Sequence, residues 1–194
     1  MILGLTGSIG SGKTFVTRCF EDLGAVAIRA DELAREVVAP GTPAHSEILR
    51  HFGPGVLLPD GNLNRVELAQ KVFADPGARR LLESIIHPRV REREIELIEQ
   101  HLGAPIVVLE IPLLFETGSQ DMCDEVLVVT IDEEQRRARL KESRGMTDEQ
   151  IDARLAAQLP QEEKLRRATC HIDNSGTREQ TRAAVAELHR RLLS

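Results

Sequence analysis

A chain of 194 residues, 41% hydrophobic and 29% charged, is long enough to bury a core and fits one α/β domain with room for an inserted subdomain. Its net charge of −6 excludes a general electrostatic affinity for nucleic acid or anionic membranes, and the absence of Trp and Tyr removes the aromatic platforms of single-strand binders. The longest apolar run, 105–115, is too short to span a bilayer. We therefore expect a soluble, cytoplasmic protein without nucleic-acid or membrane partners, as a monomer or small homo-oligomer.

The three cysteines, Cys19, Cys123 and Cys170, are widely spaced and form no C-x-x-C pair. This spacing argues against a zinc site and against a disulfide framework. We expect three reduced, buried thiols.

The first predicted element is a buried strand, Ile2–Thr6, which runs directly into a G-x-x-x-x-G-K-[ST] motif at residues 7–14. Its glycines let successive backbone N–H groups converge on an anion at the start of a helix predicted over about 13–23. The sequence therefore predicts a nucleoside triphosphate site, with Lys13 reaching the β- and γ-phosphates and the Thr14 hydroxyl on Mg²⁺. The strand before the motif and the helix after it argue against a glycine-rich turn that matches by chance.

Four further apolar runs alternate with helical stretches, as a parallel sheet requires. They cover residues 25–29, 106–109, 126–131 and, as a short run, 171–173. The last precedes a helix opened by the capping box Thr177-x-x-Gln180. The pattern predicts an α/β fold of the P-loop NTPase, nucleoside-monophosphate-kinase-like class, with a five-stranded parallel sheet flanked by helices.

Two segments fall outside that sheet. Residues 32–102 contain several helical stretches and no strand, and are broken by turns such as Pro59-Asp-Gly61. Residues 133–167 form a charged helical hairpin hinged at Gly145, in the place of a closing lid. We expect a single kinase domain with its core in 1–31, 103–132 and 168–194, a helical insertion beside the ligand cleft and a lid.

Two carboxylates follow predicted strands, at the sheet edge where ligands gather in open α/β folds. Asp31, after the second strand, is placed either to accept a proton from an acceptor hydroxyl or to cap the next helix. Glu110 ends the third strand, where P-loop enzymes place an acid near Mg²⁺, and a structural role fits it equally well. The sequence alone leaves both pairs of alternatives open.

Of the lid arginines Arg136, Arg137, Arg139, Arg144 and Arg154, Arg144 is favoured for the phosphates because it lies beside Gly145 at the turn. The other four are expected on a solvated face with acidic partners: Arg136, Arg137, Arg139 and Arg154. His87-Pro88 is expected to interrupt a long helical stretch, with His87 either facing the cleft or merely packed or solvated.

Four stretches, in this order and spacing, resemble the dephospho-CoA kinases, which catalyse the last step of coenzyme A synthesis. They are Gly4-Leu-Thr-Gly-Ser-Ile-Gly-Ser-Gly-Lys-Thr14, Ala30-Asp-Glu-Leu-Ala-Arg-Glu-Val-Val-Ala-Pro-Gly41, Ile86-His-Pro-Arg-Val-Arg91 and Ile111-Pro-Leu-Leu-Phe-Glu116. The similarity continues through Gln158, Lys164 and Ile172-Asp-Asn-Ser-Gly176.

The resemblance implies that ATP, with Mg²⁺, phosphorylates the ribose 3′-hydroxyl of dephospho-CoA. It implies catalytic roles for Asp31 as base, Lys13 and the lid residue Arg144, and acceptor binding by residues 32–102. The implied ATP-binding residues are Gly7, Gly10, Ser11, Gly12, Lys13, Thr14, Phe15, Arg144 and Asn174. The implied acceptor-binding residues are Asp31, Arg35, His87, Arg91, Pro112 and Leu113, and the implied metal-binding residues are Thr14 and Glu110.

The chain departs from the family pattern at several positions. Arg29-Ala30-Asp31 replaces the common Asp-Ala-Asp, Thr14 replaces the usual Ser, Ser8 replaces a common Gly, and Glu110 stands where many members have Asp. Thr14 keeps a hydroxyl for Mg²⁺, whereas the roles of Arg29 and Glu110 stay open.

Two other functions are alternatives to this one. Another small-molecule or nucleoside-monophosphate kinase shares the cradle, acid and lid. A nucleotide-dependent switch is disfavoured because the chain has no Asn-Lys-x-Asp stretch for reading guanine.

Overall fold

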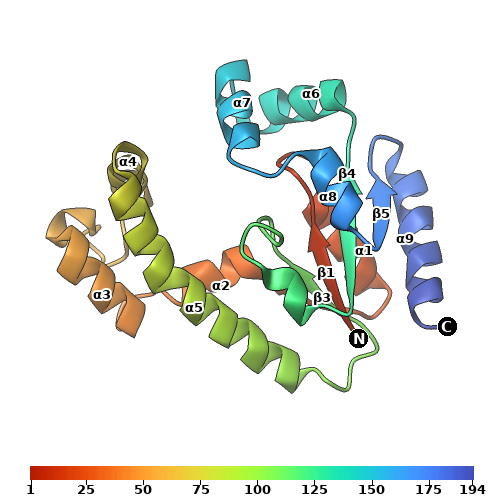
Figure 1. Cartoon of the computed structure of the whole chain (residues 1–194), viewed down its shortest axis with the longest axis horizontal. Helices are drawn as coiled ribbons and strands as arrows, with labels where there is room; N and C mark the ends of the chain where they lie inside the picture. Colours follow the sequence, from red (N-terminus) through yellow and green to blue (C-terminus); the bar gives the residue numbers. More distant parts are fainter. The chain divides into compact units, whose positions relative to one another are not determined.

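The computed structural model describes residues 1–194 and divides into two compact units, residues 1–29 with 100–194, and residues 30–99 (Figure 1). In chain order the elements are β1 (Ile2–Thr6), α1 (Lys13–Asp22), β2 (Val26–Arg29), α2 (Ala30–Glu36), α3 (Pro43–Phe52), η1 (Pro54–Val56), α4 (Arg65–Ala74), α5 (Pro76–Gln100), β3 (Val107–Glu110), η2 (Ser119–Met122), β4 (Glu125–Thr130), α6 (Glu133–Arg144), α7 (Asp148–Ala156), α8 (Gln161–Arg167), β5 (Cys170–Asp173) and α9 (Arg178–Leu192).

The first unit is built on one five-stranded sheet with the strand order β2-β3-β1-β4-β5. All neighbouring strands run parallel, and β1, which leads into the phosphate-binding loop, lies at the centre. The sequence-based prediction of a five-stranded parallel sheet flanked by helices is confirmed.

The main core lies on the face of the sheet that α1 and α9 cover. Because side chains alternate between faces along a strand, every second residue of the strands contributes to it. The buried members include Leu3, Leu5, Ile106, Val108, Leu127, Val129 and Ile172 from the strand regions and Val16, Phe20, Val185 and Leu188 from the two helices. The same alternation places Glu110, two residues after Val108, on the face toward α1.

The second unit contains α2, α3, α4 and most of α5 and has no strand, apart from an isolated bridge between Leu57 and Leu63. Its apolar cluster is formed by Val38, Ala44, Ile48, Val56, Leu63, Leu68 and Ile85. Arg93 Nε lies 2.9 Å from Glu36 Oε1, and Arg89 Nη2 lies 2.6 Å from Glu47 Oε2, so α5 is ion-paired to α2 and to α3. No helix of the chain has the length and apolar character needed to cross a membrane.

The prediction that His87-Pro88 interrupts the helix is wrong, because α5 continues through Pro88. Proline removes one backbone donor, which costs stability, but Ile85 and Ile98 are buried on either side of it and hold both halves of the helix. Arg89 Nη1 also donates to the Ile85 carbonyl at 2.6 Å. His87 itself is exposed, and both of its alternatives stay open.

The three cysteines form no disulfide. Cys19 and Cys170 are buried, and burial raises the pKa of both thiols. Cys123 is only partly buried, so the expectation of three buried thiols is wrong at that position, where the end of η2 leaves it partly accessible.

We expect the stability of the folded protein to depend on pH because of Glu94 in α5. Burial raises its pKa from 4.5 to about 7, and the nearby charge of Arg91 offsets this only in part. The folded state therefore binds this proton more tightly than the unfolded state, and the resulting stability is lost as the pH rises from about 4.5 to about 7. In Glu94→Gln the side chain stays neutral at every pH. The free energy of unfolding of this variant, relative to that of the wild type, should therefore rise on the order of 3 kcal/mol between about pH 5 and about pH 8.

Urea unfolding at the two pH values measures this gain. Glu92→Gln, at an exposed position of the same helix, is the matched control and should show no such dependence. An equal effect of Glu94→Gln at both pH values would contradict the prediction.

Candidate active site

The phosphate-binding loop has the backbone that its glycines were predicted to allow. Gly10 and Gly12 adopt φ values of +78° and +87°, a region that L side chains rarely occupy. A Cβ at Gly12 would overlap the side-chain amide of Asn174. No side chain caps the start of α1 and no acidic residue lies in its first turn, so the positive end of this helix can face an anion.

Lys13 lies across this loop. Its Nζ donates to the carbonyl oxygens of Gly7 at 2.7 Å and Ser8 at 3.3 Å. The ammonium group is thus held beside the loop backbone, next to the N–H groups that a phosphate would contact.

Asn174, in the loop after β5, connects three parts of the first unit. Its Nδ2 donates to the Ser11 carbonyl at 2.7 Å, and its Oδ1 accepts from Thr181 Oγ1 at 2.9 Å. Arg139 Nη2 donates to the Asn174 carbonyl at 2.9 Å. The structure therefore brings Asn174 against the phosphate-binding loop, where its amide supports the backbone of Ser11.

Phe15 is the predicted nucleotide-binding residue that follows Thr14. The guanidinium carbons of Arg178 and Arg182 lie 5.6 Å and 5.5 Å from the centre of its ring. These contacts join the start of α1 to α9.

The two predicted metal-binding residues are brought together. Thr14 Oγ1 donates to Glu110 Oε1 at 3.1 Å, although the residues are 96 positions apart. The Glu110 side chain is only 10% exposed, and its Oε2 is buried without a hydrogen-bond partner. Mg²⁺ prefers oxygen ligands, so a hydroxyl and a carboxylate with one oxygen that accepts no hydrogen bond form a suitable donor set.

Arg29 faces this carboxylate, which sequence reasoning missed. Its Nε lies 3.7 Å from Glu110 Oε2, and its Nη2 lies 2.5 Å from Glu21 Oε2. The strand register pairs Arg29 with Glu110. Predicting the contact would have required the order of the strands, with β2 next to β3.

The segment predicted as a lid follows β4 and consists of α6, α7 and α8 rather than a two-helix hairpin. Gly145, with φ +60°, ends α6, and a capping box of Thr147 and Gln150 opens α7. Arg144 is exposed in the last turn of α6, and Arg154 is exposed on α7.

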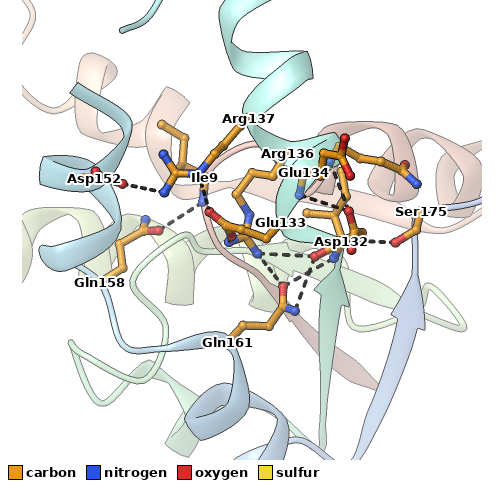
Figure 2. A network of polar contacts seen from close by, with 12 residues as sticks. Ile9, Asp132, Glu133, Glu134, Arg136, Arg137, Asp152, Gln158, Gln161 and Ser175 are labelled. Carbon is orange, nitrogen blue, oxygen red and sulfur yellow. Dashed lines mark hydrogen bonds and ion pairs between the residues drawn. The ribbon is translucent and has the colours of Figure 1, made fainter. Parts of the chain in front are cut away.

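The expected solvated face with acidic partners is wrong at two arginines of this segment. Arg139 is partly buried and its Nη2 donates to the Asn174 carbonyl. Arg136 is buried, and Figure 2 shows its contacts. Its guanidinium group is ion-paired with Glu133, and its Nη2 donates to Gln161 Oε1 at 2.6 Å and to the Ile131 carbonyl at 3.5 Å. It therefore joins the base of α6 to α8 and to the end of β4.

Arg137 has the acidic partners that were expected of the other lid arginines. Its Nη2 lies 2.5 Å from Asp152 Oδ1 and its Nη1 lies 3.3 Å from Asp148 Oδ1, and the hydrogen bond to Asp152 raises its pKa. These contacts connect α6 to α7 (Figure 2).

Gln158, between α7 and α8, links the segment predicted as a lid to the phosphate-binding loop (Figure 2). Its Oε1 accepts from the backbone N–H of Ile9 at 3.0 Å. Apart from the resemblance, no sequence pattern indicated a role for Gln158, since a hydrogen bond across 149 residues leaves no local pattern.

The loop after β3 carries Pro112 and Leu113 and is fixed by a fully buried lysine. Lys164 Nζ donates to the Pro112 carbonyl at 3.3 Å and lies 3.2 Å from Glu116 Oε1. Burial lowers the pKa of Lys164, and the charge of Glu116 opposes this shift. Glu116 also accepts from the Leu159 N–H at 2.8 Å, so this loop is joined to α8 and to the residues before it.

The remaining predicted residues belong to the second unit. Asp31 and Arg35 are exposed on α2, and His87 and Arg91 are exposed on α5. Asp31 is the second residue of α2, so it lies inside the helix and does not precede it as the capping alternative required. Its role and those of the other three stay predictions.

Three comparisons agree on the family. The profile of the dephospho-CoA kinase family matches residues 1–180. Among curated relatives, the dephospho-CoA kinase of Symbiobacterium thermophilum is 48% identical over 186 residues, covering 95% of this chain and 78% of the relative, and that of Geobacter sulfurreducens is 47% identical, covering 96% of both.

Solved structures agree with this. A Thermus thermophilus protein has a TM-score of 0.85 at 37% identity, with 98% of this chain and 97% of that one covered. The dephospho-CoA kinase of Campylobacter jejuni has a TM-score of 0.73 at 25% identity, with 98% and 96% covered. A shikimate kinase from Bacteroides thetaiotaomicron, at 15% identity, TM-score 0.53 and 99% and 98% coverage, shares the fold. With a matching profile from the first strand to α9 and relatives nearly half identical, the chain belongs to the dephospho-CoA kinase family.

Proposed function

We propose that this chain transfers the γ-phosphoryl group of ATP to the ribose 3′-hydroxyl of dephospho-CoA, giving CoA and ADP. The observation that carries the proposal is the contact between Thr14 and Glu110 beside the phosphate-binding loop, because it joins a phosphate cradle to an oxygen donor set for a metal. Membership of the family supplies the acceptor.

In this proposal the loop backbone, the start of α1 and Lys13 bind the triphosphate. Phosphoryl transfer needs little covalent chemistry from a protein, so positioning and positive charge account for most of the rate. Gly7, Gly10, Ser11, Gly12 and Asn174 shape the cradle, and Phe15 adds an aromatic surface beside it.

Mg²⁺ would be held by Thr14 and, directly or through water, by Glu110. When bound, the ion would neutralise charge on the β- and γ-phosphates. The buried Oε2 of Glu110, which accepts no hydrogen bond, supports this assignment.

The acceptor is assigned to the second unit together with the loop after β3. Asp31 would hold the ribose hydroxyl and take its proton, and the other acceptor contacts would come from Arg35, His87, Arg91, Pro112 and Leu113. The exposure of the four α2 and α5 residues supports their being available to a ligand. We also propose that the enzyme works in the cytoplasm as a monomer or small homo-oligomer, without nucleic acid.

Turnover with ATP and Mg²⁺ is the direct test, with dephospho-CoA and AMP compared as acceptors. We expect turnover with dephospho-CoA and little with AMP, and ³¹P NMR of the product should show a new phosphomonoester at the ribose 3′ position. Preference for AMP would instead favour the nucleoside-monophosphate kinase alternative.

Arg144 is predicted to contribute its charge when the lid closes on both substrates. Arg144→Ala should lower kcat on the order of 10³-fold, because a transition-state contact to the phosphates is lost. Its melting temperature should change little, since the exposed end of α6 makes few buried contacts. Arg144→Lys should restore little activity, because lysine lacks the planar fork for two phosphate oxygens.

Steady-state turnover and thermal melts of both variants decide the role of Arg144. Arg154→Ala, at another exposed lid position, is the matched comparison. Wild-type turnover in Arg144→Ala with a large loss in Arg154→Ala would transfer the role to Arg154.

A further inference from the structure

We propose that Arg29 is a positioning residue of the metal site, where it holds the Glu110 carboxylate against Thr14. The inference rests on the part of the proposed function that places the metal at Thr14 and Glu110. It assigns a role to a residue at which the chain departs from the family pattern.

The strand register sets up the arrangement. Leu5 of β1, Glu110 of β3 and Arg29 of β2 lie side by side at the ends of three adjacent strands. Residues that pair across parallel strands direct their side chains to the same face, and here that face is covered by α1. Arg29 and Glu110 are therefore directed toward the helix that begins at the phosphate-binding loop.

The contacts run from α1 through both residues and back to α1. Glu110 receives a hydrogen bond from Thr14 on one oxygen, at 3.1 Å, and lies 3.7 Å from Arg29 Nε with the other. The guanidinium group of Arg29 extends to Glu21, near the end of α1, at 2.5 Å. Glu21 thereby orients Arg29, which faces Oε2 of Glu110, the oxygen that Thr14 does not contact.

The electrostatics explain why Glu110 needs this partner. A carboxylate that is 10% exposed has lost most of its hydration, and a nearby positive charge compensates for that loss and holds the side chain in place. Arg29, whose side chain is 21% exposed, supplies that charge from the opposite side to Thr14. The distance of 3.7 Å between Arg29 Nε and Glu110 Oε2 is too long for a hydrogen bond. Oε2 therefore keeps the capacity to bind a metal or a metal-bound water.

The test measures metal binding without turnover. Mn²⁺ serves as the probe, and the free Mn²⁺ signal in electron paramagnetic resonance gives its affinity for the protein–ADP complex. Five variants are compared with the wild type: Arg29→Met, Arg29→Lys, Glu110→Gln, the double variant Arg29→Met with Glu110→Gln, and Arg190→Met. Arg190 forms an exposed ion pair with Glu187 on α9 and controls for the loss of one positive charge.

Arg29→Met should weaken Mn²⁺ binding about 10- to 100-fold, the range typical of residues that orient a metal ligand. Arg29→Lys should recover part of this loss, because lysine keeps the charge but cannot contact Glu21 and Glu110 as the guanidinium group does. The double variant should bind Mn²⁺ no more weakly than Glu110→Gln alone, since Arg29 acts through Glu110. Arg190→Met should match the wild type.

The outcomes separate the inference from the proposed function. If Glu110→Gln binds Mn²⁺ as the wild type does, the metal placement fails and the inference fails with it. If Glu110→Gln weakens binding but Arg29→Met does not, the metal placement stands and the role of Arg29 is wrong. If the loss of Mn²⁺ affinity in the double variant equals the sum of the losses in the two single variants, expressed as free energies, Arg29 acts independently of Glu110. This result also overturns the inference. Thermal melts of the protein without ADP identify a variant that has merely lost stability, and Arg29→Lys then provides the test.

Discussion

Replacing Lys13 with alanine is expected to lower kcat on the order of 10³-fold or more while the protein stays folded. The reason is electrostatic, because the transferred phosphoryl group develops charge that a fixed ammonium group stabilises. Lys13 already lies against the loop carbonyls of Gly7 and Ser8, so it needs little reorganisation to reach a phosphate. Steady-state kinetics with saturating ATP and dephospho-CoA measures the loss.

Two controls accompany this prediction. Arg190→Ala removes one positive charge from an exposed ion pair on α9 and should keep wild-type turnover. Circular dichroism and thermal melts show whether Lys13→Ala has folded. Near-normal turnover in a folded Lys13→Ala protein would remove the central support for phosphoryl transfer at this loop.

Asp31→Asn is expected to lower kcat by roughly 10² to 10⁴-fold with little effect on ATP binding. Asparagine keeps the size of the side chain but cannot take a proton from the ribose hydroxyl. Because Asp31 is exposed inside α2, its replacement should also leave the melting temperature almost unchanged. The measurements are kcat with dephospho-CoA, ATP affinity by calorimetry, and thermal melts.

Asp121→Asn, at an exposed position of η2, provides the same chemical change away from the predicted machinery and should be neutral. If Asp31→Asn melted early and kept its turnover, Asp31 would act in the stability of α2 and the base would have to be sought elsewhere.

The two departures from the family pattern, Arg29 and Glu110, are neighbours in the sheet. They are 81 residues apart in the chain, as their numbers show, yet the pairing of β2 with β3 brings them into register. A positive residue in place of an acid at one position thus faces a buried acid at the other. The sequence left the roles of both residues open, and the structure shows that they form an ion pair beside the phosphate-binding loop.

Local sequence determined the elements of the sheet and the shape of the loop. Apolar runs of three to six residues formed strands close to their predicted bounds. The glycines of the motif adopted backbone angles that other residues rarely adopt, and the capping boxes at Thr147 and Thr177 opened helices. These signals depend on residues within a few positions of one another, which is why they can be read from the chain.

Tertiary structure alone decided four other features. Packing of Ile85 and Ile98 carried α5 through Pro88, and the joining of α6 to α8 buried Arg136. The fold of the loop after β3 brings Lys164 into an ion pair with Glu116, and the strand order brings Arg29 into an ion pair with Glu110. Each of the last three contacts joins residues far apart in the chain. The free energy of burying a charge, or of keeping a proline inside a helix, depends on packing partners that only the assembled fold supplies.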